Sequence, residues 1–109
     1  MKTREMKVDA FFSEEMHLRL EAVAKTNDLP VSGVVRLLLS RAKNKEMPWT
    51  PQIRNAEFDY LRAKKFSMRV EVARNAEFDK LALQNGITRS ELIRTMVEYE
   101  LTQMQGDEL

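Results

Sequence analysis

The chain has 109 residues, which suits one ordinary domain or two small modules. Its 18 Lys and Arg nearly balance its 17 Asp and Glu, which excludes a strongly basic or acidic chain but not a local basic patch. Cysteine is absent, so disulfides, thiol nucleophiles and cysteine-held zinc or iron–sulfur centres are excluded. With 43% hydrophobic residues and only three Gly and three Pro, the composition favours a globular and mainly helical protein.

Neither a targeting segment nor a membrane span is expected. Residues 1–12 contain no apolar run long enough for a signal peptide, and the most apolar stretch, residues 34–39, is far shorter than a membrane span. We therefore expect a cytoplasmic protein without membrane contact.

The first predicted element is a short strand over residues 7–13, where side chains alternate between two faces. Its apolar face consists of Val8, Ala10 and Phe12. Its other face consists of Lys7, Asp9, Phe11 and Ser13. Ser13 is a suitable N-cap for a helix over residues 16–27. Pro30 is acceptable in the first turn of a second helix, in which residues 34–39 are apolar nearly all round.

Residues 44–64 are predicted to be a linker. Thr50-Pro51 is typical of a helix start, so we expect a connecting helix over residues 51–63. Within the linker, residues 54–59 (Arg-Asn-Ala-Glu-Phe-Asp) recur letter for letter as residues 74–79. We have no physical account of this repetition, and a local sequence duplication is the simplest explanation.

A second strand is predicted over residues 65–72, where polar and apolar residues alternate strictly. One face consists of Phe66, Met68, Val70 and Val72, and the other of Lys65, Ser67, Arg69 and Glu71. A helix over residues 74–84 follows and ends at Asn85-Gly86, because glycine accepts the left-handed conformation of a helix C-terminus. Thr88-Arg89-Ser90-Glu91 then fits a capping box that begins another helix.

The two halves of the chain share one apolar pattern when Leu20 is aligned with Phe78 and Ser32 with Ser90. Each copy has the order strand, helix, helix, and neither copy alone could bury enough apolar surface. We therefore expect a mainly α fold with a short two-stranded antiparallel β-ribbon, in which the units 1–43 and 65–109 form an intramolecular pseudo-dimer. A domain-swapped or true homodimer is the rival arrangement.

The second copy resembles the ribbon-helix-helix superfamily of Arc- and MetJ-type DNA-binding repressors. The alternating strand, the junction Asn85-Gly86-Ile87-Thr88-Arg89-Ser90-Glu91 and the run Leu92-Ile93-Arg94 carry the resemblance over about 35 residues. The first copy matches loosely. A tandem chain is similar in plan to the ribbon-helix-helix accessory proteins of plasmid relaxosomes. The resemblance implies sequence-specific binding of double-stranded DNA, as a transcriptional repressor or a plasmid transfer or partition accessory protein.

In that family the ribbon lies in the major groove and strand side chains read base edges. Carried over by position, the readers are Lys65, Ser67 and Arg69, whose side chains suit hydrogen bonding to bases. The start of the family's second helix binds backbone phosphate, which here implies Thr88, Arg89 and Ser90.

The first copy offers a different set of outward residues, Lys7, Asp9 and Phe11. Asp9 could accept from cytosine but is repelled by phosphate, and Phe11 could touch only a thymine methyl or pack elsewhere. A pseudo-dimer would therefore read two unlike half-sites on a non-palindromic core site. Alternatively, the first copy contributes only structure.

Charge placement suggests the partners. Residues 62–74 hold five basic residues and one acid, whereas residues 98–109 hold four acids and no base. We expect duplex DNA as the partner, with possible homo-oligomers on DNA and a possible protein partner for the acidic C-terminal tail. No catalytic constellation is recognisable, so neither an enzyme nor a cofactor is expected. The alternative to DNA binding is a protein-interaction module, such as an antitoxin or adaptor, that does not read DNA.

Overall fold

The computed structural model describes residues 4–43 and 58–109. This part of the chain is mainly helical, with four helices and one two-stranded antiparallel sheet, as expected. The elements in chain order are β1 (Glu5–Phe12), α1 (Glu14–Thr26), α2 (Val31–Lys43), β2 (Lys64–Glu71), α4 (Val72–Gln84) and α5 (Arg89–Gln103).

The two strands form a ribbon with one apolar and one polar face. β1 pairs with β2 along its whole length, from Glu5 opposite Glu71 to Phe12 opposite Lys64. Every pair joins two odd-numbered or two even-numbered residues, so the apolar sets of both strands fall on the same side. The buried members of this inner face are Val8, Ala10, Phe12, Met68 and Val70, and Met6 and Phe66 pack against them.

The predicted second strand was shifted by one residue, because it was expected over residues 65–72 and lies over Lys64–Glu71. Val72 begins α4 and is 44% exposed, so it does not extend the inner face. Its amide still donates to the carbonyl of Arg4 at 3.0 Å, as the last cross-strand bond before the chain turns into the helix. Helix formation redirects the side chain although the alternating pattern continues through it.

Helices α1 and α4 begin two residues earlier than the sequence predicted, at Glu14 and Val72. α1 begins at Glu14, directly after Ser13, whose Oγ accepts from the amide of Met16 at 3.2 Å. The predicted cap is therefore confirmed, while the helix begins two residues before the expected position. At α5 both bonds of the predicted capping box are present between Thr88 and Glu91.

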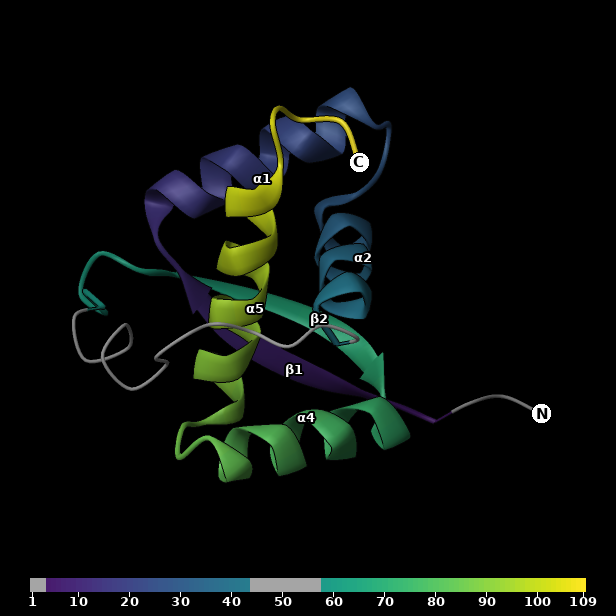
Figure 1. Cartoon of the computed structure of the whole chain (residues 1–109), viewed down its shortest axis with the longest axis vertical. Helices are drawn as coiled ribbons and strands as arrows, with labels where there is room; N and C mark the ends of the chain where they lie inside the picture. Colours follow the sequence, from purple (N-terminus) through teal and green to yellow (C-terminus); the bar gives the residue numbers. More distant parts are fainter. Residues whose placement is uncertain (1–3, 44–57) are drawn as a thin grey trace.

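Helices α2 and α5 cover the inner face of the ribbon. In Figure 1 they stand side by side against it, with α1 above and α4 below. The fully buried helical side chains belong mainly to these two helices, because α5 packs on α2, α4 and β1, and α2 packs on α5 and α1. They include Val34, Val35, Leu38, Leu39, Leu92, Ile93, Met96 and Val97.

The predicted connecting helix over residues 51–63 is wrong where the structure describes it. Residues 51–57 lie outside the described part, and Tyr60 to Arg62 form a turn and bend. The amide of Leu61 donates to Asp59 Oδ1 at 3.0 Å, a local bond typical of turns. Phe58 and Tyr60 both contact Arg94, and a helix would direct residues two apart to different sides.

No helix in the described ranges is long and apolar enough to span a membrane.

The turns between the paired helices provide a test of backbone strain. Gly86 follows α4 with φ 67°, and Asp28, its equivalent in the first half of the chain, follows α1 with φ 54°. Only glycine adopts this left-handed region without a Cβ clash. We expect Gly86→Ala to lower the free energy of unfolding by about 1 kcal/mol. We expect Asp28→Gly to raise it by about 0.5 kcal/mol, because the relief of left-handed strain exceeds the added entropy of the unfolded chain.

Urea denaturation of the two variants and the parent measures both effects. A loss of stability in Asp28→Gly as large as that in Gly86→Ala would contradict the equivalence of the two turns.

Candidate nucleic-acid interface

The outer face of the ribbon carries the six residues that the sequence singled out as base readers. They pair across the strands as Lys7 with Arg69, Asp9 with Ser67, and Phe11 with Lys65. Lys7, Lys65, Ser67 and Arg69 are exposed, and Asp9 and Phe11 are half-buried. Side chains alternate between the two faces along each strand, and the register pairs odd-numbered residues with odd-numbered ones. The six residues therefore lie on the same face.

At the centre of this outer face, three of the six residues bind one another. Ser67 Oγ donates to Asp9 Oδ1 at 2.5 Å, and Lys65 Nζ lies 3.6 Å from Asp9 Oδ2. The hydrogen bond from Ser67 lowers the pKa of Asp9; desolvation opposes it, and the charges of Lys65 and Lys7 add to the lowering. Asp9 is therefore ionised at neutral pH and neutralises part of the positive charge of the face.

One end of the ribbon is basic. Lys7 and Arg69 face each other there, and Glu5 and Glu71 form the next outward-facing pair. Arg36 of α2 reaches the same end, where its Nη2 donates to the carbonyl oxygen of Arg69 at 2.6 Å. Sequence reasoning did not place Arg36 near this face, because the contact joins residues 33 positions apart.

The opposite end of the ribbon is aromatic. The ring of Phe11 meets that of Tyr60 edge to face, with centroids 6.2 Å apart, and Tyr60 meets Phe58 in the same manner at 5.0 Å. Tyr60 is half exposed, so it enlarges the outer face beyond Phe11. Sequence reasoning missed Tyr60 because it assigned residues 51–63 to a helix; the aromatic alternation of residues 58 and 60 was the available signal.

A buried arginine holds this aromatic end in place. Arg94 of α5 is only 2% exposed, and its guanidinium carbon lies 3.5 Å from the centroid of the Phe58 ring. Arg94 Nη1 donates to the carbonyl oxygen of Phe11 at 3.4 Å. Through the ring and the carbonyl, Arg94 joins the segment at residues 58–60 to β1.

The predicted phosphate-binding residues at the start of α5 are partly engaged within the protein. In the capping box, the Thr88 hydroxyl oxygen accepts from the amide of Glu91, and the Thr88 amide donates to the Glu91 carboxylate. Arg89 Nη1 donates to Asn75 Oδ1 at 2.8 Å and lies 4.0 Å from Asp79, so its side chain is directed toward α4. Ser90 Oγ is buried and has no hydrogen-bond partner among the described residues. The amides of the first helical turn have no partner within the helix, as in any α-helix.

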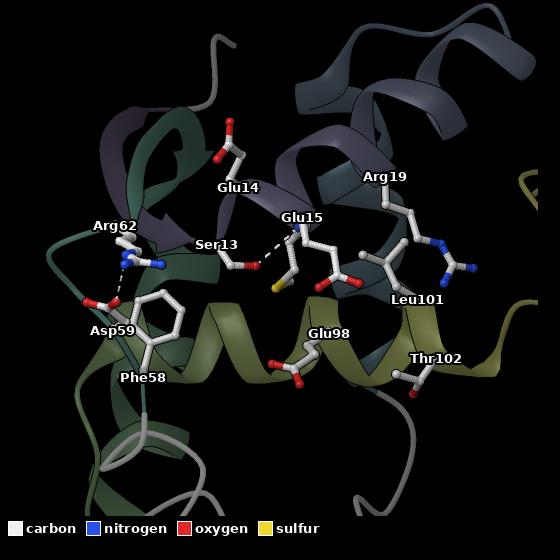
Figure 2. Close-up of a pocket in the computed structure, with 11 residues that line it drawn as sticks. Ser13, Glu14, Glu15, Arg19, Phe58, Asp59, Arg62, Glu98, Leu101 and Thr102 are labelled. Atoms are coloured by element: carbon white, nitrogen blue, oxygen red, sulfur yellow. Dashed lines mark hydrogen bonds and ion pairs between the residues drawn. The ribbon is translucent and has the colours of Figure 1, made fainter.

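A hollow of about 610 Å³ lies away from these residues. It is lined by the start of α1, the C-terminal half of α5 and residues 58–62. Figure 2 shows Glu15 and Glu98 entering it from α1 and α5, while Arg62 turns to Asp59 at 3.7 Å. None of the six outer-face residues lines it. In residues 4–43 and 58–109, no group of three or more His, Asp or Glu could hold a metal ion.

The acidic C-terminal tail folds back onto the turn after α1. Asn27 Nδ2 donates to the carbonyl oxygen of Asp107 at 2.6 Å, and Asn27 Oδ1 accepts from the amide of Leu109 at 3.1 Å. Met104 and Leu109 pack against the core. A protein partner for this tail stays a prediction.

Comparisons with protein families, with curated proteins and with solved structures found no match to this chain.

The bond between Ser67 and Asp9 predicts a measurable pKa change. We expect Ser67→Ala to raise the pKa of Asp9 toward its ordinary value of 3.8, because the largest cause of its lowering is removed. A carboxyl group with a lowered pKa stabilises the fold above its unfolded pKa, and this contribution disappears as the pH falls through the folded pKa. The variant should therefore lose less stability on acidification.

Carbon-detected NMR titration of the carboxyl groups measures this effect. Glu77, whose pKa is lowered by Lys43 on a different part of the surface, is the internal control and should titrate unchanged. An Asp9 carboxyl that titrates at the same pH in both proteins would show that Ser67 does not stabilise the charge.

Proposed function

We propose that this chain is a tandem ribbon-helix-helix protein that binds double-stranded DNA through the outer face of its ribbon. The single observation that carries the proposal is the two-sided ribbon: one face is buried under α2 and α5, and the other presents Lys7, Lys65, Ser67 and Arg69 to solvent. The major groove of B-form DNA admits a two-stranded β-ribbon.

Several pairs of features at equivalent positions of the two halves support the tandem interpretation. α1 begins at residue 14 and α4 at residue 72, and each has 13 residues. Asn27 and Asn85, which the same alignment pairs, each donate from Nδ2 to the carbonyl four residues earlier at 2.8 Å. The residues of the central ribbon pair, Asp9 and Ser67, are also equivalent to each other in this alignment. A two-fold axis through that pair would relate the two halves of the molecule.

The cross-unit arginine contacts follow the same relation. Arg36 donates to the carbonyl of Arg69, and Arg94 donates to the carbonyl of Phe11. In the alignment of the two halves, Arg94 is the counterpart of Arg36, and Phe11 is the counterpart of Arg69. Each unit thus bonds the strand of the other unit through an equivalent arginine, as the tandem interpretation requires.

The chemistry of the outer face suits base edges. Arg69 and Lys65 can reach guanine O6 and N7, and Ser67 can donate or accept. Asp9 can accept from cytosine N4, and Phe11 can touch a thymine methyl group. Because Asp9 holds Ser67 and Lys65 in the free protein, these three residues would meet DNA as one bonded group. The amides at the start of α5 would bind a backbone phosphate.

The two ends of the outer face are unlike, so the protein would read a non-palindromic site. The Arg69 end offers guanidinium groups, and the Phe11 end offers rings. A repressor or a plasmid transfer or partition accessory protein would use such a site. A protein-interaction module that does not read DNA is the alternative. Affinity for DNA that falls steeply with salt favours the first, because neutralised phosphates release counterions.

Arg69→Ala is expected to weaken binding to the cognate duplex by about 1–3 kcal/mol and to relax base preference at one position. The thermal midpoint should barely change, because the side chain is exposed and faces away from the core. Fluorescence anisotropy with the duplex upstream of the protein's own gene, and with single-base variants of it, measures affinity and preference.

Lys25→Ala is the matched control, since it removes an exposed positive charge at the far end of α1. A variant Arg69→Ala that unfolds but keeps its affinity per folded molecule would overturn the assignment of the outer face to DNA. Affinity that does not depend on salt, or no affinity for any duplex, would favour the interaction module.

A further inference from the structure

Three arginines from three different elements surround one hollow at the basic end of the ribbon. The hollow has a volume of about 300 Å³ and is lined by Arg36 of α2, Arg69 of β2 and Arg74 of α4, together with Val70 and two carboxylates, Glu5 and Glu71. None of the residues predicted to bind phosphate lines it. The hollow is therefore distinct from the start of α5.

Contacts within the protein hold two of these guanidinium groups. Arg36 Nη2 donates to the carbonyl oxygen of Arg69 at 2.6 Å, and Arg74 Nη1 donates to Ser40 Oγ at 3.0 Å. A guanidinium has five N–H donors, so each of these contacts leaves donors for a ligand. The positions of the two groups are thus set before any ligand arrives, which lowers the entropic cost of binding.

The opposite end of the ribbon has no such set among the described residues. The equivalents of Arg36, Arg69 and Arg74 in the other half of the chain are Arg94, Phe11 and Met16. Arg94 is buried against Phe58, Phe11 contacts Tyr60, and Met16 packs on the core. At the aromatic end, apolar side chains thus occupy two of the three equivalent positions. The fold therefore does not need three arginines at these positions, and the set at the basic end calls for another explanation.

We propose that this hollow binds one phosphodiester group of the DNA backbone, beside the bases that the outer face reads. The inference rests on the proposed function. Guanidinium groups bind phosphate oxygens through two parallel N–H bonds, and duplex DNA carries one phosphate charge for about every 1.7 Å of its axis. When the outer face of the ribbon lies in the major groove, a cationic hollow at its margin would therefore lie beside a phosphate of the backbone.

The two carboxylates make the site sensitive to the loss of a single arginine. Three arginines and two glutamates give the hollow a formal charge of +1. Neutralising any one arginine brings this formal charge to zero, which weakens the attraction for an anion. The contact would anchor one end of the protein on the backbone, and it would give binding a fixed orientation on a non-palindromic site.

Arg36→Gln and Arg74→Gln test the site, with Lys25→Gln as the matched control. Arg69 is left unchanged, because the proposed function already assigns it a base contact. Affinity for the cognate duplex and for a random duplex is measured at several salt concentrations. We expect each arginine variant to reduce the slope of log affinity against log salt by about 1, and to weaken both duplexes by the same factor.

Arg36→Lys, which keeps the charge, should retain the parent slope. Circular dichroism melts confirm that the variants are folded. Slopes for both arginine variants equal to that of Lys25→Gln, with the parent still binding duplex, would overturn the phosphate site and leave the proposed function standing. A parent protein that binds no duplex would overturn both. NMR shifts of Arg36 and Arg74 on adding inorganic phosphate, without duplex binding, would assign the hollow to a small anion instead.

Discussion

The pairing of β1 with β2 is the interaction on which the rest of the structure depends. In the described residues each strand has only the other as a strand neighbour, and a two-stranded ribbon is marginal without a layer packed on it. The register pairs even-numbered residues with even-numbered ones, so the apolar side chains of both strands share one face. This face is buried in the same core as side chains of α2 and α5. The same register collects the polar side chains on the outer face. The core and the candidate interface are thus two consequences of one alignment.

The buried guanidinium of Arg94 makes the two ends of the ribbon different. Its counterpart Arg36 binds an equivalent carbonyl but stays at the surface. The difference comes from Phe58 and Tyr60, which cover Arg94 and have no equivalent at the other end among the described residues. A segment between the two halves of the chain therefore gives the ribbon a basic end and an aromatic end. The proposed binding to a non-palindromic site would require asymmetry of this kind.

The repeated hexapeptide shows how little a short sequence decides by itself. Phe78 and Asp79 lie within α4, where Phe78 is buried. Phe58 and Asp59 carry the same letters but precede a turn, and Phe58 lies against Arg94. The expectation of a helix over residues 51–63 gave too much weight to local helix signals. Packing against a buried cation from another part of the chain outweighs that local preference.

Local patterns in the sequence determined the order of the elements, the faces of both strands, the capping box at Thr88 and the left-handed turn at Gly86. These features depend on residues a few positions apart, so periodicity and cap chemistry are sufficient to predict them. Only the tertiary structure decided that Asp9 bonds to Ser67, that Arg36 and Arg74 meet beside Arg69, and that Tyr60 extends the outer face. Each of these contacts joins segments far apart in the chain, and their distances follow from strand register and helix docking, which a single sequence does not encode locally.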